Sequence, residues 1–222
     1  MLSWSVFALW SLLDANIWGA NAASEFEGKV ISLAVIKIAL NKFYVEYDEA
    51  HPGHPCTRLT DLTPKMVGLG GSVKRLKTKA METFYIVTFL VQLLPAHLGA
   101  LGPSGISILE SGRCLLNCVA MLKRAPVVIS YSVAGELLDV WKRYMTLVEP
   151  FDIYTPKAHL MYHMVLRSMR QGNPWGYNTF FDEGLNKLLK RTLRLCHQAT
   201  FEFMAMVKFG ELLMRTGRPR LS

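Results

Sequence analysis

Apolar residues recur every three or four positions along most of the chain, which is the spacing of one buried helical face. Residues 29–47 show this spacing most clearly, with Lys37, Asn41 and Lys42 on the polar side. Because residues 30–38 are rich in β-branched side chains, a strand is an alternative prediction for that part of the segment. Further helices are expected over residues 73–94, 108–123, 127–147, 157–170 and 182–215. These elements predict an all-α fold, an irregular bundle of about six to eight helices.

Proline and glycine divide this helical pattern. Residues 51–65 hold three prolines and a glycine, and a Gly-Leu-Gly-Gly-Ser break follows at 68–72. This break precedes an expected helix and is followed by Lys74, as in a phosphate-binding loop. Because it lacks the Gly-Lys-Ser/Thr ending and a preceding strand, we interpret it as a hinge. The chain then divides into an N-terminal helical segment, 1–50, and a main helical domain, 62–222, whose last third is basic.

The apolar stretch that contains Trp4 and Trp10 raises the question of a signal peptide. Small residues at 20–24 resemble a cleavage region, but no basic residue precedes Lys29, and Asp14 interrupts the stretch. We interpret it as an apolar helix that packs inward, with a secreted protein as the alternative. If its tryptophans formed an exposed patch instead, a scaffold that associates with a membrane or a protein partner would be indicated.

Composition excludes several classes of protein. The 222 residues are 51% hydrophobic and 19% charged, which rules out an intrinsically disordered chain. Four cysteines are too few for a disulfide scaffold, and Cys114 and Cys118 suit buried free thiols on a helix. The best candidate for a membrane span, residues 83–94 between Glu82 and Pro95, is shorter than the roughly 20 residues that cross a bilayer. We therefore expect a core helix there and no integral membrane span.

The net charge of +8 lies almost entirely in the last third of the chain. Residues 156–222 hold 11 Lys and Arg against 4 Asp and Glu, whereas residues 1–155 hold 14 against 13. A smaller basic run is expected at the start of the helix over 73–94, and it consists of Lys74, Arg75, Lys77 and Lys79.

Four basic residues are expected on the last helix: Lys187, Lys190, Arg191 and Arg194. Helical spacing places three of them on one stripe with Lys190 beside it, and leucines point away. Such a stripe can neutralise phosphates and release counterions, so duplex DNA binding would weaken with salt and disappear on charge reversal at Arg191 and Arg194. The alternative is a solvated surface helix.

Two histidines, His159 and His163, lie four residues apart on an expected helix and so share a face. Glu183 and His197 are candidates for the third ligand, and Glu183 would give a metal-dependent, hydrolase-like site for a divalent ion. The metalloprotease signature also requires a Glu after the first histidine, and Leu160 stands there. Histidines held by hydrogen bonds, and Asp182 and Glu183 as helix-capping acids, are the alternative interpretation.

The order of short motifs gives a resemblance. The motifs are Pro-Lys-Ala-His-Leu-Met-Tyr-His-Met at 156–164, Gly-Asn-Pro at 172–174, Asp182-Glu183, Leu-Lys at 189–190 and, upstream, Leu-Lys-Thr-Lys-Ala-Met-Glu-Thr at 76–83. Together they resemble the C-terminal part of cut-and-paste DNA transposases of the CACTA (En/Spm) kind and related mobile-element proteins. The resemblance spans about residues 62–209 and lies in the order of the motifs along the chain, not in sequence identity.

The resemblance implies the helical part that accompanies an RNase H-like nuclease, in which three carboxylates surround two metal ions. Asp182 or Glu183 is the only position that could correspond to the third acid, and strands for the first two are missing. We therefore expect a catalytically incomplete mobile-element fragment that binds nucleic acid or other protein chains. The metal-dependent site and the helical scaffold remain alternatives. A location inside the cell is favoured, in the nucleus if the source is eukaryotic.

Overall fold

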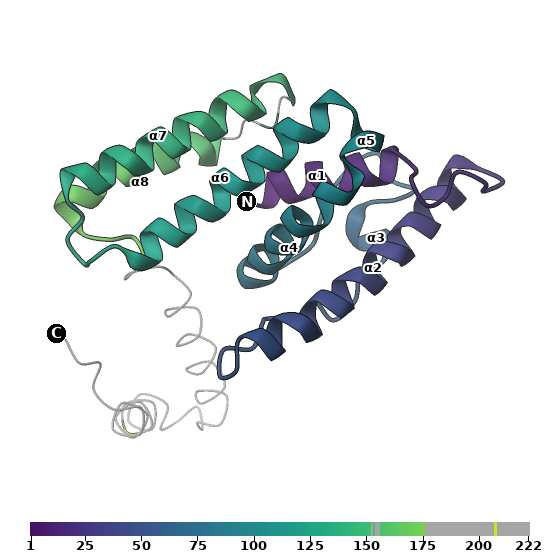
Figure 1. Cartoon of the computed structure of the whole chain (residues 1–222), viewed down its shortest axis with the longest axis horizontal. Coiled ribbons are helices and arrows are strands. Elements are labelled where there is room, and N and C mark those ends of the chain that lie inside the picture. The colour runs from purple at the N-terminus through teal and green to yellow at the C-terminus, as the bar shows by residue number, and fades with distance from the viewer. Residues whose placement is uncertain (152, 154–155, 176–206, 208–222) are drawn as a thin grey trace, which may run out of the picture. The chain divides into compact units, whose positions relative to one another are not determined.

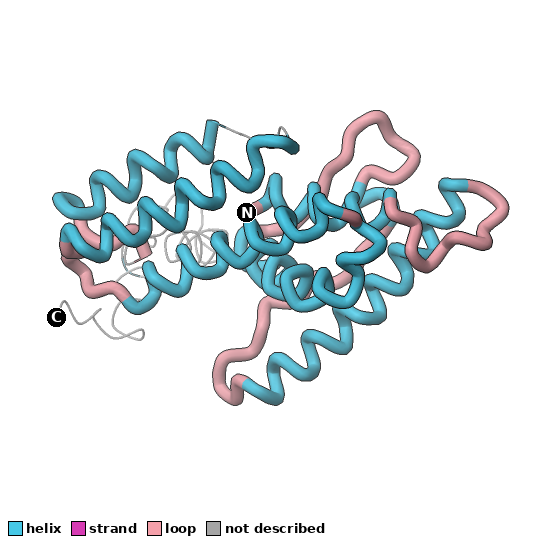
Figure 2. The backbone as a smooth tube through the Cα atoms, turned by 45° about the horizontal axis from the view of Figure 1, so that its top comes forward, coloured by secondary structure: helices cyan, strands magenta, loops and turns pink. Residues whose placement is uncertain are grey.

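The structure is a computed structural model that describes residues 1–151, 153, 156–175 and 207, and the side chains of these residues except those of 2 and 156–159. Within these residues the regular secondary structure is helical and no strand occurs (Figure 1 and Figure 2). The all-α, irregular multi-helix bundle is thereby confirmed. The chain forms two compact units, residues 1–172 and 173–222, and every element named below belongs to the first.

Helices α1 (Leu2–Asp14), α2 (Glu25–Ala50) and α4 (Ala80–Leu93) pack against one another around an apolar core. Side chains from all three helices meet there: Leu9, Ile36, Leu40, Ile86, Phe89 and Leu90. Ser24 caps the start of helix α2, where its hydroxyl accepts the backbone N–H of Glu27 (3.2 Å). The strand alternative over 30–38 is wrong, because α2 is continuous through these residues.

The second half of the unit is a layer of three long helices. Helix α6 (Pro103–Arg124) packs along α7 (Tyr131–Val148), and α7 packs on α8 (Pro156–Gln171) (Figure 1). Short elements connect the two halves: the 3-10 helix η1 (Leu94–His97) and α5 (Leu98–Leu101), with η2 (Glu149–Phe151) after α7. The predicted helices over 108–123, 127–147 and 157–170 correspond to α6, α7 and α8.

Helix α1 joins the two halves through Trp4. The side chain is fully buried, and its indole N–H lies 2.8 Å from the Ser111 hydroxyl and 3.2 Å from the carbonyl oxygen of Ile108 on α6. Trp10 is 7% exposed. The inward packing predicted for this helix is therefore confirmed, and α1 presents no exposed tryptophan patch of the kind expected for membrane or partner association.

The proline-containing segment after α2 is fastened back onto that helix. The Asp48 carboxylate accepts the backbone N–H of Cys56 (2.7 Å) and pairs with Arg58, and the Tyr44 hydroxyl accepts the N–H of Leu59 (3.1 Å). These bonds hold the pKa of Asp48 down at about 2, chiefly through the Cys56 N–H and then the Arg58 guanidinium. The segment is thus an ordered part of the unit although it contains little helix.

Two stretches of helix are long and apolar enough to cross a membrane by length and composition alone: Ala80–Leu101 and Pro103–Arg124, within the described residues. Core helices of proteins that never enter a membrane pass the same test. About a third of the first stretch and half of the second are buried inside the protein. The absence of an integral span therefore stays a prediction.

Candidate anion-binding loop

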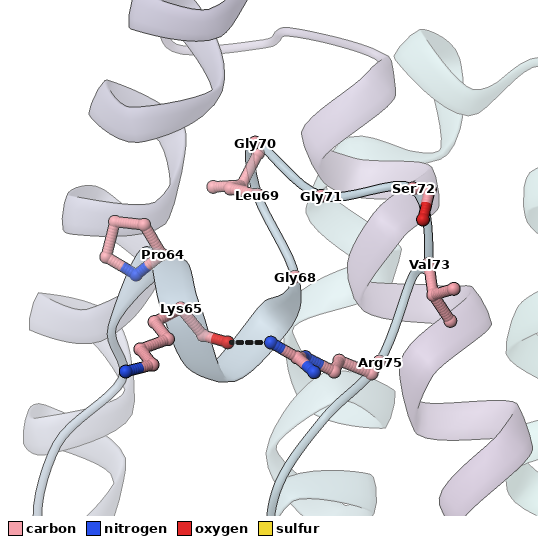
Figure 3. A pocket seen from close by; sticks show the side chains of 9 residues that line it. All are labelled: Pro64, Lys65, Gly68, Leu69, Gly70, Gly71, Ser72, Val73 and Arg75. Carbon is pink, nitrogen blue, oxygen red and sulfur yellow. Dashed lines mark hydrogen bonds between the residues drawn. The ribbon is translucent and has the colours of Figure 1, made fainter.

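A tight hydrogen-bonded turn follows the short helix α3 (Pro64–Val67) (Figure 3). The Thr63 hydroxyl accepts the N–H of Met66 (3.3 Å), and Gly68 ends the helix in the left-handed conformation with φ of 82°. A Cβ on Gly68 would lie 2.3 Å from the carbonyl oxygen of Val73. Only glycine fits this position without a backbone shift.

The chain after the turn runs back along α3 without forming helix. The backbone N–H groups of Arg75 and Lys77 donate to carbonyl oxygens of α3 over 3.2 and 3.3 Å. Leu76 between them is 4% exposed, while Arg75, Lys77 and Lys79 are exposed. This alternation is that of an extended segment, in which every second side chain lies on the same side, about 6.6 Å apart.

Helix α4 therefore begins at Ala80, and the predicted start near Val73 is wrong. The physical reason is that backbone N–H groups in residues 74–79 donate to carbonyl oxygens of α3 and not to carbonyl oxygens within a helix of their own. At the true start, the Glu82 carboxylate accepts the backbone N–H of Lys79 (2.8 Å). The basic run that the sequence places on a helix lies on an extended segment instead.

An open hollow of about 540 Å³ lies between α3 and the returning chain (Figure 3). Arg75 reaches from the returning chain toward α3, where its guanidinium donates to the backbone carbonyl oxygen of Lys65 (3.3 Å). The hollow is lined by Pro64, Lys65, Gly68, Leu69, Gly70, Gly71, Ser72, Val73 and Arg75. Cationic, hydroxyl and backbone groups thus surround it together with two aliphatic side chains.

Five cationic side chains and no carboxylate occur between residues 65 and 79. Lys74 is paired with Asp14 (2.6 Å), and the ammonium of Lys79 lies 3.9 Å from Glu82. Of these five cations, Lys65, Arg75 and Lys77 have no carboxylate of a described residue within ion-pair distance. Their charge is available to a bound anion.

The base of the loop is held by Trp10. Its indole N–H donates to the carbonyl oxygen of Val67 (3.0 Å), and the ammonium groups of Lys74 and Lys29 lie 4.8 and 5.6 Å from the ring centre. Asp14 bonds both lysines. Partial burial opposes ionisation of Asp14, but the hydrogen bonds from Lys29 and Lys74 outweigh it and hold its pKa below the ordinary value.

Most of the site residues predicted from sequence lie outside the described residues. They are the basic stripe Lys187, Lys190, Arg191 and Arg194, and the acids Asp182 and Glu183. His159 lies in α8, but its side chain is among those not described. His163 is exposed on α8, with its ring 5.8 Å from that of Tyr162. Both the stripe and the metal-dependent site therefore stay predictions.

Among the described residues, no group of three His, Cys, Asp or Glu side chains could hold a metal ion. Cys114 and Cys118 are buried free thiols on α6, as predicted, and Cys56 is a third. Burial raises the pKa of all three thiols, that of Cys118 to about 12. Thiols of this kind are poor nucleophiles and metal ligands, which agrees with a structural role.

Comparisons of the chain with protein families, curated proteins and solved structures found no match. The resemblance to CACTA-type transposases accordingly stays a prediction that rests on the order of motifs. The loop at 64–79 is the site that the described geometry adds.

Two sequence signals point to this loop in retrospect. Thr63 followed by Pro64 is a typical helix start, with a capping hydroxyl and then a proline in the first turn. Proline is suited to this position because an N–H there would have no acceptor within the helix. The five cations without an acid are also visible in the sequence. What the sequence does not show is that backbone bonds to α3 hold the cations in an extended row.

Proposed function

We propose that this protein binds nucleic acid through the phosphate backbone and that it is a catalytically incomplete derivative of a transposase-like protein. The observation that carries the binding proposal is the exposed pair of Arg75 and Lys77 on the returning chain, with Lys65 across the hollow from Arg75. Several exposed cations with no competing carboxylate are what sequence-independent phosphate binding requires.

The distribution of charge supports the same function. The basic loop and the excess of seven cations in residues 156–222 both favour a polyanionic partner. We propose that the stripe of Lys187, Lys190, Arg191 and Arg194 forms a second contact, with duplex DNA. This part of the proposal rests on sequence spacing alone, and so does the assignment to the transposase lineage.

The test is retention of fluorescent single-stranded and duplex oligonucleotides of mixed sequence, measured at several salt concentrations. Neutralising the loop with Lys65→Gln, Arg75→Gln and Lys77→Gln should weaken binding and flatten its salt dependence. Each lost phosphate contact reduces the slope of log affinity against log salt by about 0.7 for a single strand and about 0.9 for a duplex.

A matched control keeps the same change in net charge. Lys42→Gln, Arg113→Gln and Lys142→Gln remove three exposed cations that each lie beside a carboxylate on a helix surface. This variant should bind like the wild type. Equal losses in both triple variants would show that net charge alone attracts the nucleic acid, and no retention of either oligonucleotide by the wild type at low salt would refute the proposed function.

A further inference from the structure

An exposed aromatic ring lies at the tip of the basic loop. Phe26, in the first turn of α2, is 53% exposed, and a Cβ built on Gly70 would lie 3.5 Å from its Cε2 atom. The ring therefore rests against the glycine turn that lines the hollow. In the described residues no other aromatic ring stacks on it.

The carboxylates next to Phe26 in the sequence are occupied by protein partners. Glu25 pairs with the ammonium of Lys29 (2.6 Å), and the Glu27 carboxylate accepts the backbone N–H of Ala23 (3.1 Å). Of these two acids only Glu25 is paired with a cation, whereas Glu27 keeps its charge and is held in place by a backbone N–H. Lys65 and Arg75, on the other side of the turn, have no carboxylate of a described residue within ion-pair distance, and the guanidinium of Arg75 donates to the carbonyl oxygen of Lys65.

An accessible ring beside unpaired cations is the arrangement that proteins use for single-stranded nucleic acids. Bases that are not stacked in a duplex can stack on an aromatic side chain while lysine and arginine hold the flanking phosphates. In a duplex the faces of each base pair are covered by the neighbouring pairs, so an exposed aromatic ring cannot stack on them.

We propose that the loop at 64–79 is a single-strand site, in which an unpaired base stacks on Phe26 and the adjoining phosphates contact Lys65, Arg75 and Lys77. This inference rests on the proposed nucleic-acid binding and narrows its substrate class. Base identity contributes little, because every base presents a flat face. The site selects an unpaired strand by the accessibility of its bases and holds it by charge.

The experiment compares three fluorescent ligands of equal length with the full chain: oligo(dT), an abasic deoxyribose-phosphate strand and a duplex. The Phe26→Ala variant should bind oligo(dT) roughly 5- to 150-fold more weakly, the range that loss of one base–aromatic stack gives. It should bind the abasic strand and the duplex as the wild type does. Phe26→Trp should restore binding of oligo(dT).

Ile38→Ala is the matched control, since it truncates an apolar side chain on the same helix that is even more exposed (70%) than Phe26. This variant should bind all three ligands like the wild type. Phe26→Ala without effect on oligo(dT), or with the same effect on the abasic strand, overturns the single-strand site. If the triple Gln variant of the loop still binds these ligands more weakly than the wild type, nucleic-acid binding by the loop stands although the single-strand site does not. If the wild type binds none of the three ligands, both proposals are refuted.

Discussion

The indole ring of Trp4 lies directly over Gly112, so that a Cβ on the glycine would come within 2.3 Å of the Cζ2 atom of Trp4. Helix α6 thus carries a glycine at the point where α1 crosses it. Gly112→Ala should lower the free energy of unfolding by about 1–3 kcal/mol, the usual cost of overpacking a core. Urea denaturation followed by tryptophan fluorescence measures the loss.

Gly135→Ala on α7 is the control for this substitution, because no atom lies within 4 Å of the added Cβ. It should leave stability unchanged or raise it by up to about 1 kcal/mol, since alanine favours helix over glycine. Equal destabilisation by both substitutions would contradict the close contact between Trp4 and α6.

The turn at Gly68 can be tested in the same way. Gly68→Ala should weaken binding of single-stranded DNA several-fold, because the new Cβ forces apart the turn that holds Lys65 and Arg75 at the hollow. Gly53 has a similar φ of 88° but open space around it, so Gly53→Ala carries the left-handed strain without the steric clash. If both variants lose binding, the loss comes from left-handed backbone strain and not from the steric clash at Gly68.

Stability should depend on Asp48 at acid pH. Its folded pKa of about 2 lies below the model-peptide value of 3.8, so its contribution is complete above about pH 4 and is lost as the pH falls toward 2. Asp48→Asn should therefore make the fall of the urea midpoint between pH 4 and pH 2 shallower. Asp139→Asn, on an exposed side chain of α7, should retain the wild-type slope. Identical slopes for all three proteins would contradict the anchoring role of Asp48.

The buried thiols should resist alkylation. At pH 8 a thiol with a pKa of about 12 is ionised in a fraction on the order of 10⁻⁴, and the thiolate is the reactive form. Iodoacetamide should leave Cys118 unmodified in the native protein and modify it in urea, as peptide mass spectrometry can locate. Rapid modification of native Cys118 would mean that α6 is not packed as described.

Duplex binding tests the basic stripe predicted from sequence. Arg191→Glu with Arg194→Glu should weaken salt-sensitive retention on duplex DNA, down to what the loop alone provides, and leave binding of oligo(dT) by the loop in place. Lys42→Glu with Lys142→Glu, on α2 and α7, provides a control of equal charge. Undiminished retention of duplex DNA by the stripe variant would remove that surface from the proposal.

Helical spacing predicted the long elements well because each of them buries one face. Helix α2, from Glu25 to Ala50, contains the whole of the predicted 29–47 segment, and the tryptophans of α1 face the core as expected. The class of the fold follows from these periodic segments and from the absence of competing strand patterns elsewhere.

The start of α4 shows where local patterns fail. Residues 74–79 have acceptable helix propensity, yet the N–H groups of Arg75 and Lys77 bond to α3, and Leu76 is buried beneath the segment. Such tertiary contacts override weak local preferences. The cations could be read from the sequence, but their extended row and the position of Phe26 beside Gly70 depend on how distant segments pack.

The contact between Trp4 and Ile108 also has a consequence for synthesis of the chain. Helix α1 leaves the ribosome about one hundred residues before α6, which supplies the acceptors for its indole N–H. At translation rates of about 5–20 residues per second, about 5–20 s pass between the synthesis of α1 and that of α6. During that interval the indole of Trp4 lacks its acceptors, and the nascent chain presents to chaperones an apolar side chain that is fully buried in the finished protein.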